Sequence, residues 1–218
     1  MLTEACIAAI EGREDERPQR GRLRLFRSPV LEALFRSPPW LPFVTVPPIL
    51  GALVDQGAIR APLVVLAGAV MWAGLEYAMH RWLFHPKGSA RAMVGYRFLV
   101  HGHHHARPWD EGRLVATPWQ LATAAAALYG AAQVFGARWD AAFAGGLVAY
   151  LAYEALHYAI HHASGGPRWL QGVRAHHLRH HHGPAGAAQG FGISSPLFDL
   201  LLGTRAPTGA TPRSGAEA

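Results

Sequence analysis

All fourteen histidines of this 218-residue chain lie between positions 80 and 182, in four short clusters. The clusters read HRWLFH, HGHHH, HYAIHH and HHLRHHH. Imidazole is the commonest metal ligand, and a buried one is costly because its second nitrogen also needs a partner. Adventitious binding, as by a purification tag, is disfavoured because the clusters are internal and fall in two distant segments. The sequence therefore predicts a metal site.

Helical spacing indicates which histidines can converge. Residues i, i+3 and i+4 of an α-helix share one face. This rule brings together two triplets and a pair, namely His101, His104 and His105, then His177, His180 and His181, then His157 and His161. His80 and His85 lie about 140° apart on a regular helix, so they converge only if the helix is distorted or ends between them. Pro86 favours a helix end there.

These ten histidines exceed the needs of one metal ion. A structural zinc takes about four protein ligands, and a catalytic zinc about three and a water. Ten imidazoles fit two metal ions with about five each, which leaves an octahedral position open on each ion. The pattern predicts a dinuclear centre, but imidazole suits iron, copper, zinc and nickel alike.

Four histidines remain outside this set. His103 points about 200° away from His105 on a helix, so we expect that it is not a ligand. His162, His176 and His182 each adjoin a stronger candidate. They stay open as extra ligands, as hydrogen-bond partners of ligands, as substrate contacts or as surface groups.

Two carboxylates share helical faces with presumed ligands. Glu76 lies four residues before His80, and Glu154 lies three before His157. Ionisable groups in or near a bilayer are expensive and usually functional. We expect each carboxylate to accept the outer N–H of a ligand imidazole and so fix its tautomer. The alternative is a carboxylate at the membrane boundary paired with an arginine.

The elements that carry these residues read as membrane helices. Half of the chain is hydrophobic and 16% is charged, against roughly 25% in soluble domains. Four apolar stretches approach the roughly 17 to 25 residues of a spanning helix. They are residues 40–54, 61–79, 119–135 and 139–156. The first is weakest because it contains prolines. We predict an all-α integral membrane protein with about four transmembrane helices and a helical, histidine-rich cap that holds a dimetal site.

Charge gives the expected orientation. The net charge is +6, and all but Arg60 and Arg138 of the 20 lysines and arginines fall on the side of the histidine clusters. The positive-inside rule then places the clusters and both termini in the cytoplasm of a multi-pass protein. Basic residues beside membrane-spanning helices normally set the orientation of the protein in the membrane, so nucleic-acid binding is disfavoured. The lone Cys6 excludes an internal disulfide.

Composition also suggests a division of the chain. Residues 1–38 form a basic N-terminal arm that we expect to be partly disordered, and residues 39–204 form the membrane domain. Residues 205–218 are rich in Pro, Gly, Ser and Thr, which predicts a disordered tail.

The segments EYAMHRWLFH, HGHHHARPWDEGRLV, YEALHYAIHH and HHLRHH, followed by GFGISSPLFDLLLGT, resemble the fatty acid hydroxylase superfamily, most closely the fatty acid 2-hydroxylases. The resemblance implies a dimetal centre ligated by His80, His85, His101, His104, His105, His157, His161, His177, His180 and His181, the same ten that geometry selects. The position of His162 is not a ligand in that family. The positions of His103, His176 and His182 are not expected to be histidine.

The family's chemistry implies an O₂-dependent hydroxylase that inserts a hydroxyl into an acyl chain at C2. Such an unactivated C–H bond requires a redox metal. The expected cofactors are two iron ions with O₂ as co-substrate, and zinc in purified protein would be a substitute because it has no redox chemistry. Some relatives carry a fused cytochrome b5 domain that we do not find here. A separate electron donor is therefore implied, whether cytochrome b5-like protein, ferredoxin or reductase.

Several alternatives stay open. A sterol or carotenoid hydroxylase or desaturase of the related histidine-box families is the main rival. A membrane metal-binding or transport protein would place histidines and acids throughout the spans, whereas here they gather at one end. The acyl carrier also stays open between free fatty acid, ceramide, ornithine lipid and lipid A.

We expect Asp110, Arg113 and Asp199 to tie the cap together, and GFGISSP to form a tight turn over the site.

Overall fold

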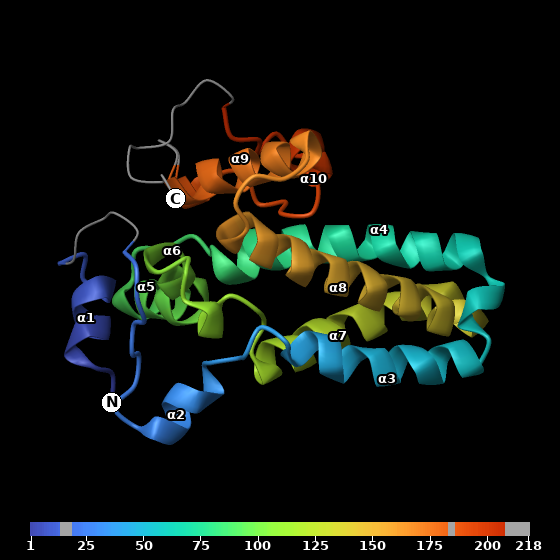
Figure 1. Cartoon of the computed structure of the whole chain (residues 1–218), viewed down its shortest axis with the longest axis horizontal. Coiled ribbons are helices and arrows are strands. Elements are labelled where there is room, and N and C mark those ends of the chain that lie inside the picture. Colours follow the sequence, from blue (N-terminus) through green and yellow to red (C-terminus); the bar gives the residue numbers. More distant parts are fainter. Residues whose placement is uncertain (14–18, 183–185, 208–218) are drawn as a thin grey trace.

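The computed structural model describes residues 1–13, 19–182 and 186–207, and within these ranges the chain is helical (Figure 1). The described residues hold no β-strand, only an isolated antiparallel bridge between Leu2 and Phe26. The all-α prediction is confirmed for this part of the chain. Most of the tail predicted to be disordered, residues 208–218, lies outside the described residues.

Four helices form an elongated bundle, and each matches one of the predicted apolar stretches (Figure 1). They are α3 (Leu41–Asp55), α4 (Pro62–Ala78), α7 (Pro118–Ala132) and α8 (Trp139–His162). Pro62 and Pro118 stand at the first position of their helices, where proline loses no hydrogen bond. Helix α8 continues beyond its predicted end and carries the third histidine cluster to the end of the bundle.

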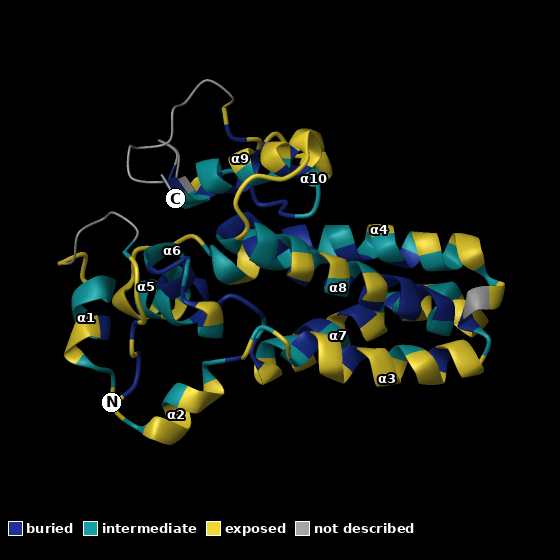
Figure 2. Ribbon diagram, in the orientation of Figure 1, coloured by how far each residue is buried: buried dark blue, intermediate teal, exposed yellow. Residues whose placement is uncertain are grey.

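Among the described residues, one helix is long and apolar enough to cross a membrane, by length and composition alone. It runs from Pro62 to Phe84 with a mean hydropathy of 1.5. Helix α3 is apolar but shorter. Exposed residues run along the outer faces of α3 and α4 (Figure 2). Several of them have large apolar side chains, including Val44, Leu63 and Leu66.

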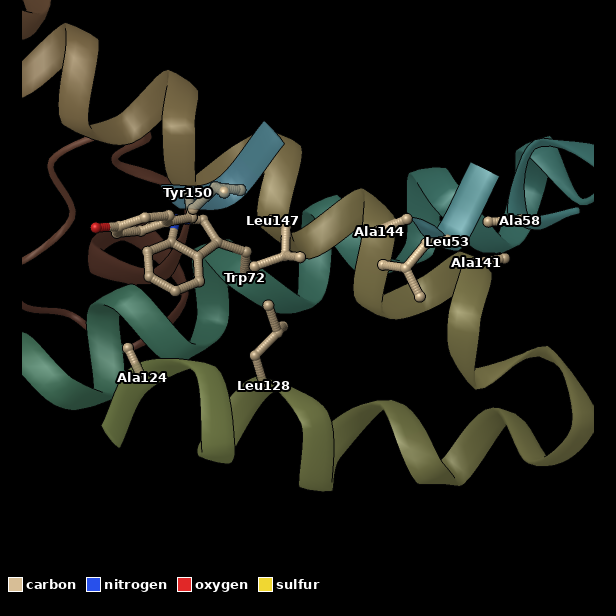
Figure 3. Close-up of a cluster of buried hydrophobic side chains, with 10 residues drawn as sticks. Leu53, Ala58, Trp72, Ala124, Leu128, Ala141, Ala144, Leu147 and Tyr150 are labelled. Atoms are coloured by element: carbon tan, nitrogen blue, oxygen red, sulfur yellow. The ribbon is translucent and has the colours of Figure 1, made fainter. Parts of the chain in front are cut away.

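The interior of the bundle is built around a close contact between α4 and α8. A Cβ atom at Gly68 would overlap the backbone of Ala142, and a Cβ at Gly145 would overlap the backbone of Val65. Small residues therefore let the two helices approach each other closely. Beyond this contact the core fills with larger side chains, including Leu53, Trp72, Leu128, Leu147 and Tyr150 (Figure 3).

Part of the N-terminal arm is packed. Helices α1 (Glu4–Ile10) and α2 (Pro29–Leu34) accompany a small second core of Cys6, Leu23, Leu25 and Phe26. The Glu32 carboxylate accepts hydrogen bonds from the backbone N–H groups of Leu25 and Phe26 and pairs with Arg113. The composition of residues 1–38 did not predict this folded structure, which is seen in the part of the arm that the structure describes. The predicted boundaries after 38 and 204 remain predictions.

The remaining elements gather toward the end of the bundle where the histidines lie (Figure 1). Two of them are π-helices, η2 (Met79–Phe84) and η3 (Phe98–Gly102). The others near this end are α5 (Arg91–Arg97), α6 (His103–Ala106), η4 (Glu111–Arg113), α9 (Arg168–His182), η6 (Gly186–Ala188) and α10 (Leu197–Leu201). Two 3₁₀ turns, η1 (Ala58–Arg60) and η5 (Gln133–Arg138), connect helices elsewhere.

Candidate metal centre

The π-helix η2 brings His80 and His85 together. The His85 backbone N–H bonds to the His80 carbonyl over 3.1 Å, which is the i to i+5 bond of a π-helix. The two imidazole ring centroids lie 5.0 Å apart. The five-residue spacing left a distortion or a helix end open, and the structure has the distortion, a π-helix.

The second cluster is also distorted, contrary to the regular helix assumed for it. His101 lies in η3, whereas His104 and His105 lie in α6. The side chains still converge, because the ring centroid of His101 lies 5.2 Å from that of His104 and 4.9 Å from that of His105. These side chains converge as the rule of shared faces predicts, although the local backbone departs from a regular α-helix.

The third and fourth clusters follow regular helical spacing. His157 and His161 lie in the last turns of α8, with ring centroids 5.1 Å apart. Helix α9 supplies His177, whose ring centroid lies 4.9 Å from that of His157. Both helices direct these imidazoles into the cap, where His157 and His177 are almost fully buried.

Nine of the ten histidines form two groups, in each of which the candidate ligand atoms lie within 4.8 Å of one another. Group A is His80, His85, His101, His105 and His180. Group B is His104, His157, His161 and His177. The tenth, His181, lies between the groups. Its Nε2 is 3.0 Å from the Nε2 of His177, and its ring stacks on His105 at 4.1 Å between centroids.

Within the groups, Nε2 atoms face one another in pairs. The Nε2 atoms of His80 and His101 are 3.1 Å apart, and those of His85 and His180 are 3.2 Å apart. In group B the Nε2 atoms of His161 and His177 are 3.0 Å apart. Only one nitrogen of such a pair can carry the hydrogen between them. Several lone pairs therefore point toward a shared point, as they would toward a metal ion.

The electrostatics of the site also suit metal ions. Burial, with help from His180 and Arg97, lowers the pKa of His85 to about 3, and burial lowers that of His180 to about 4. These imidazoles are neutral near pH 7, so each offers a lone pair. An all-imidazole donor set suits first-row transition metals. The residues present fit two such ions.

Two imidazoles of group A are fixed from outside by one turn. His80 Nδ1 lies 2.6 Å from the carbonyl oxygen of Phe191, and His180 Nδ1 lies 2.7 Å from that of Gln189. A carbonyl can only accept, so each Nδ1 must be the N–H donor and each Nε2 must carry its lone pair inward. Residues 189–194 thus fix two tautomers from one segment, which we call the GFG turn.

The two carboxylates act differently from the prediction, since neither bonds to an imidazole. Glu76 accepts from the backbone N–H groups of Ile193 and Ser194, at 2.6 and 2.9 Å, and from the Ser194 hydroxyl. Glu154 accepts from the backbone N–H of Ala116 at 3.1 Å. Glu76 therefore anchors the GFG turn, and the turn contacts the imidazoles. We had expected Glu76 to contact an imidazole directly.

The four additional histidines lie outside both groups. His103 is buried, and burial together with Arg113 and Arg36 lowers its pKa to about 3. His162 stacks on Tyr158 with ring centroids 4.5 Å apart. His182 is buried, and its ring centroid lies 5.5 Å from that of His181.

His176 has a partner that sequence reasoning missed. Its Nε2 lies 3.2 Å from Oδ2 of Asp199, which is fully buried at the start of α10. The two residues are 23 positions apart, so helical spacing gave no signal of the contact. The expectation that Asp199 ties the cap together is met through this contact and through its bonds to the GFG turn.

A cavity of about 80 Å³ adjoins both groups. His80 and His101 of group A line it, as do His104 and His157 of group B. Its other walls are largely apolar and aromatic, and they include Trp72, Met79, Leu83, Phe84, Val100, Leu114, Tyr150 and Tyr153. The two histidine groups therefore face one apolar space at the end of the bundle.

The fold and the site together define a helical protein whose apolar bundle ends in two adjacent histidine groups suited to metal ions. The chain belongs to the fatty acid hydroxylase family, whose model matches residues 65–204.

Curated relatives agree with this membership. A fatty acid 2-hydroxylase from Homo sapiens is 31% identical over 217 residues, covering 85% of this chain and 57% of the human protein. A dihydroceramide fatty acyl 2-hydroxylase from Arabidopsis thaliana is also 31% identical, covering 87% of this chain and 82% of the plant protein. This chain therefore spans little more than half the length of its human relative.

A solved structure supports the same fold. It is described as full-length scs7p with only the hydroxylase domain visible, and it is 27% identical to this chain with a TM-score of 0.74. The similarity covers 91% of this chain and 79% of the solved chain. The cap and the bundle thus follow an arrangement seen in a solved hydroxylase domain.

Proposed function

We propose that this protein is an O₂-dependent hydroxylase that inserts a hydroxyl group into an acyl chain of a fatty acid or lipid at C2. The observation that carries the proposal is the largely apolar cavity that histidines of both groups line. An acyl segment in this cavity would lie beside two metal ions at once. The names of the human and plant relatives support C2 as the position, and they favour an acyl chain over a sterol or carotenoid.

In this proposal groups A and B, with His181, each hold one iron ion, and the bound ions supply the O₂ activation that an unactivated C–H bond requires. The chain's own residues hold these ions and shape the space beside them. Trp72, Leu83 and Tyr150 give the cavity apolar walls, and its volume would admit only a short part of an acyl chain. The remainder of the chain would lie along the apolar bundle. Zinc would bind the same imidazoles without redox activity.

We further propose that α3, α4, α7 and α8 cross the membrane together. Exposed apolar side chains on α3 and α4 support this, with Leu63 80% and Leu66 62% exposed. Helices α3 and α7 have 15 residues each, fewer than the roughly 20 that span a bilayer core. Local thinning of the bilayer would accommodate them. The basic end of the bundle, with the histidine groups and both termini, would face the cytoplasm.

The proposed reaction needs a partner that supplies electrons. One oxygen atom of O₂ enters the lipid and the other becomes water, which consumes two electrons and two protons beyond those of the C–H bond. We propose that a separate cytochrome b5-like protein, ferredoxin or reductase delivers the electrons. A cytoplasmic cap would be within reach of any of these.

Lipid analysis tests the proposal. Host lipids are compared by mass spectrometry between cells that express the wild type and cells that express His177→Ala, each with a competent reductase. We expect acyl chains with one added oxygen at C2 only with the wild type. His162→Ala is a matched control, because His162 stacks on Tyr158 outside both groups, and it should retain the product. An unchanged lipid profile with the wild type would refute the hydroxylase function.

A further inference from the structure

The GFG turn is held at both ends by buried carboxylates. Asp199 accepts from the backbone N–H groups of Phe191 and Gly192, at 2.9 and 2.8 Å, and from the Thr204 hydroxyl at 2.8 Å. At the other end of the turn Glu76 accepts from Ile193 and Ser194. The turn is therefore fixed to α4 on one side and to α10 on the other.

The backbone of the turn leaves little freedom. Gly190 has φ +75°, a left-handed conformation that other residues rarely adopt. A Cβ at Gly192 would overlap the carbonyl oxygen of Ser195. With this shape the carbonyls of Gln189 and Phe191 point toward His180 and His80.

His176 completes this arrangement. The side chain of His176 is buried, and its Nε2 meets the Oδ2 of Asp199 that also accepts from Gly192. His176 is next to His177 of group B in the sequence. Its side chain nevertheless contacts the residue that anchors the turn behind group A.

Two members of group B lack an equivalent support. Across the described part of the chain, no hydrogen-bond partner meets Nδ1 of His157 or His177. These two imidazoles are positioned by the helices that carry them, α8 and α9, rather than by acceptors behind them. Acceptors that orient ligating histidines typically change metal affinity by about 10- to 100-fold.

We propose that His176 and Asp199 are positioning residues for group A, and that through the GFG turn they make group A the tighter metal site, filled before group B. The inference rests on the proposed metal centre, though not on the hydroxylation. His176 keeps Asp199 in place, Asp199 keeps the turn in place, and the turn keeps the lone pairs of His80 and His180 directed at one point. Group B then fills at higher metal concentration.

The test is a titration of the full-length, metal-free protein in detergent with Co²⁺, followed by calorimetry and by the visible absorption of bound Co²⁺. We expect two separate binding steps in the wild type. His176→Ala should weaken the first step about 10- to 100-fold and alter the absorption of the first equivalent. The second step should keep its affinity. His162→Ala serves as the control and should leave both steps unchanged.

A conservative variant separates positioning from folding. His176→Gln keeps an N–H group that can reach Asp199, so it should restore most of the first-step affinity and the absorption of the first equivalent. Asp199→Asn should resemble His176→Ala. Circular dichroism and size exclusion of every variant establish that the fold is intact.

Three results would overturn the inference. They are two equal binding steps in the wild type, equal weakening of both steps in His176→Ala, and failure of His176→Gln to differ from His176→Ala. Failure of the proposed function looks different. Two unequal Co²⁺-binding steps without any hydroxylated lipid would refute the hydroxylase function and leave this inference standing. Hydroxylated lipid together with two equal binding steps would refute this inference and leave the hydroxylase function standing.

Discussion

Groups A and B use the same side chain but position it in different ways. Group A takes His80 and His101 from two π-helices, and it depends on a turn about 110 residues further along the chain to fix His80. Group B takes His157 and His161 from the end of the 24-residue helix α8. A long, well-packed helix places its imidazoles directly, whereas distorted segments need support from elsewhere in the fold. Metal affinity should therefore respond to different substitutions in the two groups.

Removal of one ligand from each group is expected to have the largest effect. His180→Ala and His177→Ala should each abolish detectable hydroxylation, because the proposed reaction needs both ions. Each variant should lose about one of two bound ions, which elemental analysis of purified protein would measure. His180→Ala should lose the tighter ion and His177→Ala the weaker one. Loss of both ions from either variant would show that the groups do not bind independently.

The carboxylates provide a smaller and more selective change. Glu76→Ala leaves the buried N–H of Ile193 and the half-buried N–H of Ser194 without their acceptor, and each buried unsatisfied group costs about 1 to 3 kcal/mol. Glu154→Ala removes the acceptor of a single N–H, that of Ala116. We expect a larger fall in the thermal midpoint of unfolding for Glu76→Ala than for Glu154→Ala. Only Glu76→Ala should weaken the tighter metal site.

Equal effects of these two variants would contradict the role of the GFG turn. Glu76→Gln is the matched control for shape. It retains one acceptor oxygen, so its midpoint should lie between those of the wild type and Glu76→Ala.

For three members of group B, His157, His161 and His177, regular spacing was sufficient, because regular helices carry these residues. The fourth member, His104, follows the distorted segment η3. For His80 and His85 the five-residue spacing indicated either a distortion or a helix end, and the structure has a distortion in the form of a π-helix. The roles of Glu76 and His176 were not predictable, because they depend on contacts with residues 193–194 and with Asp199. Such contacts arise only when α4, α9 and α10 meet in three dimensions.

Acid pH should destabilise the metal-free protein. Burial lowers the pKa of His85 and His103 to about 3 and that of His180 to about 4, against about 6.5 in the unfolded chain. The unfolded chain therefore binds more protons between these values, and folded-state stability falls as the pH decreases. The thermal midpoint of the metal-free protein should be constant above about pH 7 and should fall below about pH 6.5.

His103→Gln tests whether a histidine outside groups A and B contributes to the fall in stability at acid pH. It removes one histidine of low pKa outside both groups, so the fall in the midpoint with decreasing pH should become shallower while metal binding is kept. An unchanged pH profile in His103→Gln would show that His103 contributes nothing to the acid sensitivity.

We propose that this chain transfers an oxygen atom from O₂ to C2 of an acyl chain beside the two histidine groups. Incubation of the purified, iron-loaded protein with lipid substrate, an electron donor and ¹⁸O₂, followed by fragmentation mass spectrometry, tests it directly. We predict a hydroxyl at C2 that carries one ¹⁸O atom, and no such product with His177→Ala. A product with oxygen from water, or no hydroxylated lipid with a competent donor, would contradict the claim.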